Sequence, residues 1–181
     1  MRTDRFNTAT VLLLQAITGM PAEHLEAVRL VPRSRNLLRM PWYPDRTGGA
    51  FVHGDRIYIT DTLHAAPASG DPAAMLRWLL LMTHEVGHVA QAWRLGGERA
   101  SRWRFTAWAA AGYAVSFLRN GRHGYRKATL EVEADRARQR GRTWMERTSG
   151  CNTQHPLIRL VMRDDAPGMA LWIHAHADLR P

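Results

Sequence analysis

The chain has 181 residues, which is enough for a single domain with a sizeable core, and 45% of them are hydrophobic. Its net charge of +9 permits attraction to nucleic acid, anionic lipid or an acidic protein. Cys151 is the only cysteine, so an internal disulfide and any multi-cysteine metal site are excluded.

The first predicted element is an amphipathic helix that ends at Gly19. As a signal peptide this segment is poor, because Asp4 lies in the region that should be basic and the apolar run at residues 11–14 is short. No stretch approaches the ~18 uncharged apolar residues that a membrane span needs. We therefore expect no membrane span, and a protein that stays in the cytoplasm or is exported by a dedicated secretion system.

A small antiparallel sheet is predicted next. Residues 27–31 have strand character, and the arginine- and proline-rich stretch from Pro32 to Asp45 follows as a loop. Two further strands, Ala50–His53 and Arg56–Thr60, flank Gly54-Asp55, which is a strong hairpin signal.

A long buried helix is predicted to begin at Pro72. Asp71 can cap it, proline suits its first position, and Gly96-Gly97 ends it. Between these signals, apolar residues recur at alternating steps of four and three, which is helical spacing: they are Met75, Leu79, Met82, Val86, Val89 and Trp93.

This helix carries the sequence His84-Glu85-Val86-Gly87-His88, which has the pattern H-E-x-x-H. Residues four apart lie on one helix face, so His84 and His88 can bind the same ion. Glu85 lies beside them and can take a proton from a water on that ion, as in zinc hydrolases. The alternative is an amphipathic helix with two histidines on its polar edge. His53 and His64 have no partner at this spacing, so we expect neither to be a ligand.

Two more helices are predicted downstream. Residues 100–118 form an apolar helix whose aromatic side chains we expect to pack in the core. After a break at Asn120-Gly121, a segment of helical character from Tyr125 to Arg140 contains Glu131 and Asp135. These carboxylates are four apart, so one can complete a metal site while the other hydrogen-bonds a ligand histidine. The alternative is a solvated acidic turn in an arginine-rich helix.

With these carboxylates the motif resembles the gluzincin branch of the zinc metallopeptidases, in which a downstream glutamate is the third ligand. The resemblance implies that His84, His88 and Glu131 bind Zn²⁺, that Glu85 is the general base, and that Asp135 hydrogen-bonds a ligand histidine.

The longer metzincin motif does not fit, because Gln91 and Arg94 stand where it requires glycine and histidine. The stretch from about Val28 to Gln91 is similar to the small zincin-like domains associated with bacterial contractile injection systems. It also resembles the metallopeptidase tails of some secretion-system spike effectors. The similarity is specific at the metal motif and loose elsewhere.

After Gly150 the pattern weakens, and a short helix at Leu157–Met162 and a last one at Gly168–Ala175 are predicted. We expect one zincin-like domain over residues 1–181, with a core at about 26–147 and a C-terminal extension at 150–181. The predicted fold is α+β and helix-rich. Three helices carry the core, and the small antiparallel sheet lies beside the H-E-x-x-H helix.

The predicted function is zinc-dependent hydrolysis of peptide bonds by a metalloendopeptidase acting on a protein or peptide. The resemblance implies a bacterial secreted effector or toxin, with a secretion-system component or a cognate inhibitor protein as partner. One alternative is a binding or structural component of an injection apparatus that cleaves nothing. Another is a peptidase-type toxin acting on cell-envelope material.

A nucleic-acid partner is not expected, because no arginine run alternates with aromatic residues as a stacking surface would. Four residues remain open candidates for the donor that steadies an oxyanion: they are His123, Tyr125, Tyr113 and Tyr58.

Overall fold

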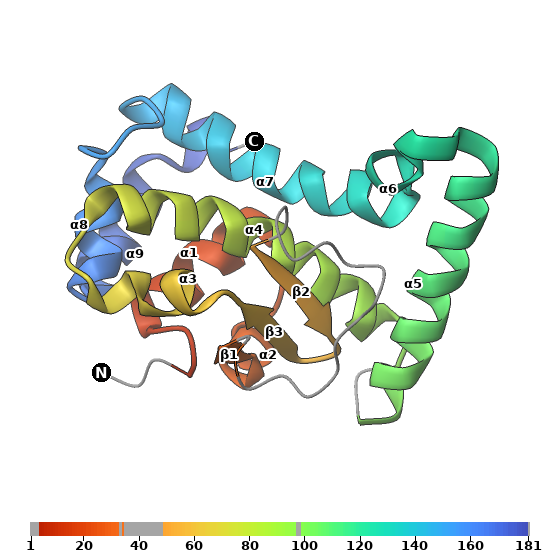
Figure 1. Ribbon diagram of the computed structural model, residues 1–181. Helices are drawn as coiled ribbons and strands as arrows, with labels where there is room; N and C mark the ends of the chain where they lie inside the picture. Colours follow the sequence, from red (N-terminus) through yellow and green to blue (C-terminus); the bar gives the residue numbers. More distant parts are fainter. Residues whose placement is uncertain (1–3, 33, 35–48, 97–98, 181) are drawn as a thin grey trace.

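The computed structural model describes residues 4–32, 34, 49–96 and 99–180, and most of the predicted loop from Pro32 to Asp45 lies outside them. Most of the described elements are helical (Figure 1). The helices are α1 (Thr8–Thr18), α2 (Ala22–Ala27), α3 (Asp61–Ala65), α4 (Pro72–Arg94), α5 (Arg99–Asn120), α6 (Gly124–Lys127), α7 (Thr129–Thr148), α8 (Pro156–Met162) and α9 (Ala166–Ala175), and the strands are β1 (Arg29–Pro32), β2 (Ala50–His53) and β3 (Arg56–Ile59).

The predicted helix-rich α+β fold is confirmed, and the three-stranded sheet has the order β1-β3-β2. The predicted hairpin is present: β2 and β3 are antiparallel, and Gly54 turns between them with φ of 65°. The expectation of a wholly antiparallel sheet is wrong, because β1 runs parallel to β3. Seventeen residues separate β1 from β2. A connection of this length does not require β1 and β2 to be neighbours, and β3 pairs with β1 instead.

Helix α4 runs through the middle of the molecule, with the sheet against one side and α7 alongside (Figure 1). It begins as predicted: the side chain of Asp71 accepts a hydrogen bond from the Ala73 amide at 2.8 Å, and Pro72 occupies the first turn. The helix ends at Arg94, before Gly96 with φ of 126°. Because α4 is surrounded, even its ionisable residues in the H-E-x-x-H motif are buried.

Helices α4 and α7 approach closely at Gly87. A Cβ added to Gly87 would lie 2.8 Å from the Cα of Ala134 on α7, which is closer than carbon atoms pack. Gly141 on α7 has a similar role further along, where an added Cβ would meet the Thr83 methyl carbon at 3.3 Å. Small residues on both helices therefore bring the backbone of α7 against the H-E-x-x-H face of α4.

The buried core draws on α1, α4, α7, α8 and the sheet. The predicted apolar helix at 100–118 forms as α5, but the expectation that its aromatic residues pack in the core is largely wrong. Phe105 is buried, whereas Trp103, Trp108 and Phe117 are exposed. An all-round apolar sequence does not show which side of a helix its neighbours cover. Within the described ranges, no helix combines the length and hydropathy required for a membrane crossing.

The predicted C-terminal helices are present as α8 and α9. Leu157, Ile158 and Val161 on α8 are buried in the same core cluster as residues of α1 and α4. His155 caps α8, where its Nδ1 accepts a hydrogen bond from the Leu157 amide at 3.2 Å.

Candidate metal centre

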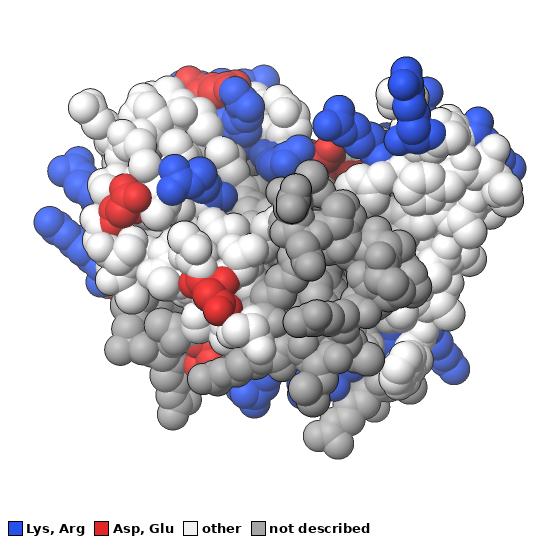
Figure 2. Space-filling model, viewed as in Figure 1, with Lys and Arg blue, Asp and Glu red and all other residues white. Residues whose placement is uncertain are grey.

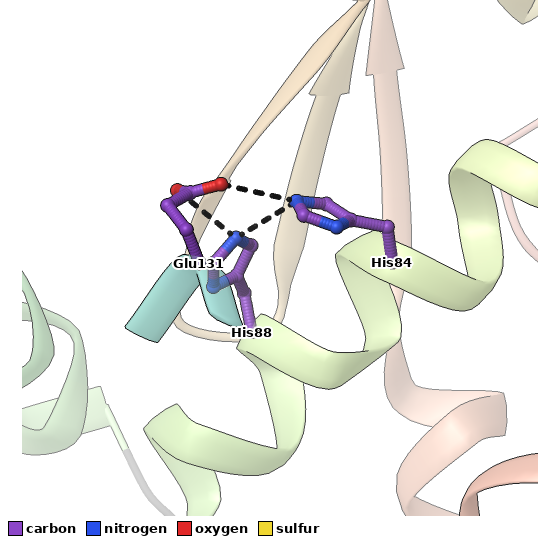
Figure 3. Close-up of side chains that lie close together, drawn as sticks. All are labelled: His84, His88 and Glu131. Atoms are coloured by element: carbon purple, nitrogen blue, oxygen red, sulfur yellow. Dashed lines mark hydrogen bonds and ion pairs between the residues drawn. The ribbon is translucent and has the colours of Figure 1, made fainter. Parts of the chain in front are cut away.

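Three buried side chains converge between α4 and α7 (Figure 3). His84 and His88 project from successive turns of α4, and Glu131 faces them from the first turn of α7. Each is less than 10% exposed, and their candidate ligand atoms all lie within 4.8 Å of one another. The structure thus brings together the three predicted ligands, and the group could hold a metal ion.

The distances within the group fit a small tetrahedral ion. The two Nε2 atoms of His84 and His88 are 3.2 Å apart. The carboxylate oxygens of Glu131 lie 3.4 Å from His84 Nε2 and 3.5 Å from His88 Nε2. Around a tetrahedral ion with bonds of about 2.0–2.1 Å, neighbouring ligand atoms are about 3.3–3.4 Å apart. All three separations are close to this edge length, although the two to Glu131 end on different carboxylate oxygens, Oε2 for His84 and Oε1 for His88. The size of the group therefore suits one small ion.

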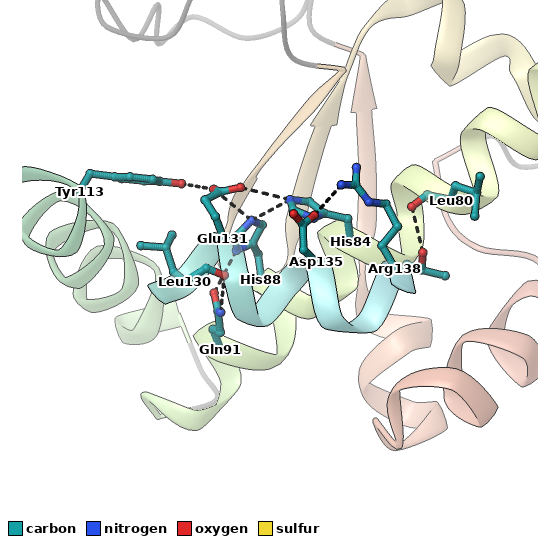
Figure 4. Close-up of polar contacts among 10 residues, drawn as sticks. Leu80, His84, His88, Gln91, Tyr113, Leu130, Glu131, Asp135 and Arg138 are labelled. Carbon is teal, nitrogen blue, oxygen red and sulfur yellow. Dashed lines mark hydrogen bonds and ion pairs between the residues drawn. The ribbon is translucent and has the colours of Figure 1, made fainter. Parts of the chain in front are cut away.

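The proton on His84 is positioned by Asp135 (Figure 4). His84 Nδ1 lies 2.9 Å from Asp135 Oδ1, and a carboxylate oxygen only accepts, so Nδ1 carries the hydrogen. The guanidinium of Arg138 donates to the same oxygen at 2.7 Å and holds the carboxylate in place. In neutral His84, Nε2 is therefore a lone pair that points at the group. This is the place that the gluzincin resemblance assigns to Asp135.

The proton on His88 is positioned by Gln91, a role that the sequence analysis did not assign. The Gln91 amide nitrogen donates to the Leu130 carbonyl at 2.9 Å and to Glu133 at 3.1 Å. Since both partners are acceptors, the amide orientation is determined, and Oε1 must face His88 Nδ1, 2.9 Å away. His88 Nδ1 is thus a donor, and His88 Nε2 carries the second lone pair that faces the group. The position of Gln91, three residues after His88 and on the same helix face, was the available signal.

Glu131 is held from the other side by α5. The hydroxyl of Tyr113 donates to Glu131 Oε1, and its ring stacks on Tyr125 with centroids 5.4 Å apart. Burial alone would raise the pKa of Glu131, but the adjacent His84 and His88 and the hydroxyl of Tyr113 lower it well below its usual range. Burial and the charge of Glu131 raise the pKa of Tyr113, so its hydroxyl stays protonated. Tyr113 was one of four open candidates for an oxyanion donor, and here it positions the carboxylate.

Glu85, the second residue of the H-E-x-x-H motif, is buried with an unpartnered carboxylate oxygen among the described residues. Its side chain is 3% exposed, and among the described residues its Oε2 has no hydrogen-bond partner. Burial raises its pKa, while the nearby His88 and His84 lower it by a smaller amount. A buried carboxylate oxygen without a partner is costly unless a water or an ion completes it. Beside two histidine lone pairs, it is consistent with a hydrated cation in the group.

The other acidic and histidine residues near the motif lie apart from the group. Glu133 pairs with Arg94 at 2.8 Å. His53 and His64 lie on β2 and α3. Burial, and after it the cationic Arg102, lower the pKa of His53.

No protein-family model, no curated protein and no solved structure matches the chain. The assignment of His84, His88 and Glu131 as a candidate metal centre therefore rests on their geometry.

Proposed function

We propose that the chain is a zinc-dependent metallopeptidase, with zinc held by His84, His88 and Glu131. The observation that supports this best is the pair of histidine Nε2 atoms, which face each other at 3.2 Å while both Nδ1 protons are directed outward. Two lone pairs and a carboxylate at one point form a site for a cation. Two imidazoles and one carboxylate favour zinc over magnesium or calcium, and three protein ligands leave a position open.

Zinc bound here would lower the pKa of a water to about 7 and polarise a scissile carbonyl. The chain's own contribution is proton transfer and orientation. Among the described residues Glu85 Oε2 has no hydrogen-bond partner, and the carboxylate interacts electrostatically with His88 and His84. We therefore assign Glu85 the role of general base, which takes a proton from the attacking water and returns it to the leaving amine. Asp135 and Gln91 hold the two histidines in the tautomer that a ligand needs. Tyr113 orients Glu131.

The test separates metal binding from catalysis by comparing metal content and peptide cleavage in three variants. We expect Glu85→Gln to retain about one zinc per chain and to lose cleavage by a factor of about 10² or more, because only proton transfer is removed. His88→Ala should lose both metal and activity. Glu146 is an exposed carboxylate on α7 that, among the described residues, pairs only with Arg142. Glu146→Gln should therefore keep both metal and activity. Equal cleavage by Glu85→Gln and wild type would rule out the mechanism.

The burial of the group supports a second candidate function. Each ligand is less than 10% exposed, which is also expected of an ion that holds α4 and α7 together without catalysis. In that case the chain is a zincin-fold component of a secretion or injection apparatus. Its biological effect would then survive Glu85→Gln but not His88→Ala, whereas a peptidase effector loses its effect in both variants.

A further inference from the structure

Helix α5 lies at one side of the molecule and links α4 to α6 (Figure 1). Its inner face is anchored: Phe105 is buried, and the Ser116 hydroxyl donates to the Gly124 carbonyl at 2.7 Å. Arg102 near its start pairs with Asp55 of the hairpin, and Tyr113 reaches Glu131. These contacts hold the helix along one face and turn the opposite face outward.

The outward face of α5 is apolar. Over residues 102–120, the exposed positions are Trp103, Arg104, Ala107, Trp108, Ala110, Ala111, Ala114, Val115, Phe117, Leu118 and Arg119. The two arginines are the only polar residues among them. Trp103 is 69% and Leu118 88% exposed, near the two ends of the helix. A continuous apolar face of this kind on a protein surface marks an interaction site.

The same region is strongly cationic. The sequence has no aspartate or glutamate from residue 99 to residue 130. Arg104 and Arg119 lie within the apolar face, and Arg122, Arg126 and Lys127 follow at exposed positions after its end. In Figure 2 the surface over α5 is mostly white, with blue groups gathered at its upper end. The partner of this face must therefore accept both apolar side chains and cations.

We propose that the outward face of α5 docks on the surface of an anionic lipid bilayer. Trp103 and Leu118 are fifteen residues apart, or about 22 Å along the helix, so a helix lying flat in the headgroup region can bury both. Arg104 and Arg119 each follow one of these residues, and their long side chains can extend to lipid phosphates. Anionic headgroups neutralise the cations while the acyl chains receive the apolar face.

The composition of the face favours a bilayer over the two other partners. Single-stranded nucleic acid would match the charge and could stack on Trp103, Trp108 and Phe117, but it would leave the aliphatic part of the face, including Leu118 and Val115, without a partner. A second copy of the chain would match the apolar residues, but it would bring cationic surfaces together with no acidic residue of α5 to neutralise them. A bilayer with anionic headgroups satisfies both properties.

The experiment is co-sedimentation of the full chain with vesicles of phosphatidylcholine, alone or mixed with phosphatidylglycerol. We expect binding to the mixed vesicles that is at least about tenfold tighter than to phosphatidylcholine alone and that weakens with salt. Trp103→Ser with Leu118→Ser should weaken it by about tenfold or more, because apolar burial is lost. Arg104→Gln with Arg119→Gln should weaken it and reduce its salt dependence.

Matched controls are available on the opposite side of the chain. Leu171 on α9 is 72% exposed, and Arg163 is exposed as well, so Leu171→Ser and Arg163→Gln change the same properties away from α5 and should leave vesicle binding unchanged. Circular dichroism and metal content should be unchanged in every variant, since the altered residues are exposed. The proposal is overturned if the wild type does not bind mixed vesicles, or if the Trp103 and Leu118 variant binds equally well. It is also overturned if α5 instead mediates self-association or binding to single-stranded DNA in the absence of lipid.

Discussion

Replacing Gly87 by alanine tests whether the close approach of α4 and α7 positions the candidate metal ligands. The new Cβ would lie 2.8 Å from Ala134 Cα, 3.2 Å from Ala134 Cβ and 3.4 Å from its carbonyl oxygen. Carbon atoms in contact are normally about 3.5–4.0 Å apart. The nearest atom belongs to the backbone, so no side-chain rotation relieves the contact. The two helices must separate by about 0.7 Å or more.

Two opposing effects decide the stability of this variant. Alanine in place of glycine inside a helix is favourable by about 1 kcal/mol. Overpacking of a well-packed interface costs about 1–3 kcal/mol, and the cost is at the upper end where backbone must move. We therefore expect a net loss of about 1–2 kcal/mol in the free energy of unfolding. Glu131 moves away with α7, by more than the ~0.2 Å tolerance of metal–ligand bonds, so metal affinity should fall about 10- to 100-fold.

The measurements are urea unfolding with and without a chelator, and a zinc titration in competition with a chromophoric chelator. Gly141→Ala is the control in the same interface, because its Cβ would meet only side-chain ends, those of Ile17 at 3.2 Å and Thr83 at 3.3 Å. These can shift by a few tenths of an ångström, so this control should keep its metal affinity. If Gly87→Ala matched the wild type in both stability and metal affinity, the approach of the two helices would not be what positions Glu131.

Three further predictions concern the ligands and the core. Gln91→Leu removes the acceptor for His88 Nδ1–H. We expect metal affinity to be about 10- to 100-fold lower in a competitive titration. Unchanged affinity would contradict the role given to Gln91. Adding a chelator should lower the melting temperature, because an ion present at 100 times its dissociation constant stabilises the fold by about 2.7 kcal/mol. An unchanged melting temperature would show that no structural ion was bound. His155 is 1% exposed, and burial lowers its pKa from 6.5 to about 4. Between pH 4 and pH 6.5, His155 is protonated in the unfolded chain but not in the folded chain. The contribution of neutral, buried His155 to the free energy of unfolding is therefore complete above about pH 6.5 and is lost as the pH falls toward 4. Urea unfolding should show about 2 kcal/mol less stability from this group at pH 5 than at pH 7. The difference should be absent in His155→Asn.

Features that depend on neighbouring residues could be predicted from the sequence. Helix α4 and the shared face of His84 and His88 follow from local rules of capping and spacing, and the structure confirms the helix over Pro72–Arg94. The hairpin at Gly54 is equally local, because its turn needs a positive φ that glycine adopts easily. The direction of β1 is not local: a strand-forming sequence carries no information on whether its neighbour runs parallel or antiparallel.

The position of Glu131 depends on tertiary packing as well as on the sequence. Family resemblance pointed to it, but its distance from the histidines depends on how closely α7 can approach α4, which Gly87 and Ala134 decide. Tyr113 escaped assignment because its partner Glu131 lies on another helix, 18 residues away in the chain, and the orientation of the Gln91 amide is determined by Leu130, 39 residues away. Hydrogen bonds of this range leave no periodic signal in the sequence.

The outward face of α5 shows the same limit. Composition and spacing predicted an apolar helix, and the helix is there. Whether Trp103 and Leu118 would be buried depended on which elements pack against α5, and the described elements cover only its other side. Sequence alone determined the long helices and the shared face of His84 and His88, because both depend on residues within a few positions. Tertiary packing decided which side chains meet and which face stays exposed, because these depend on helices that are distant in the chain.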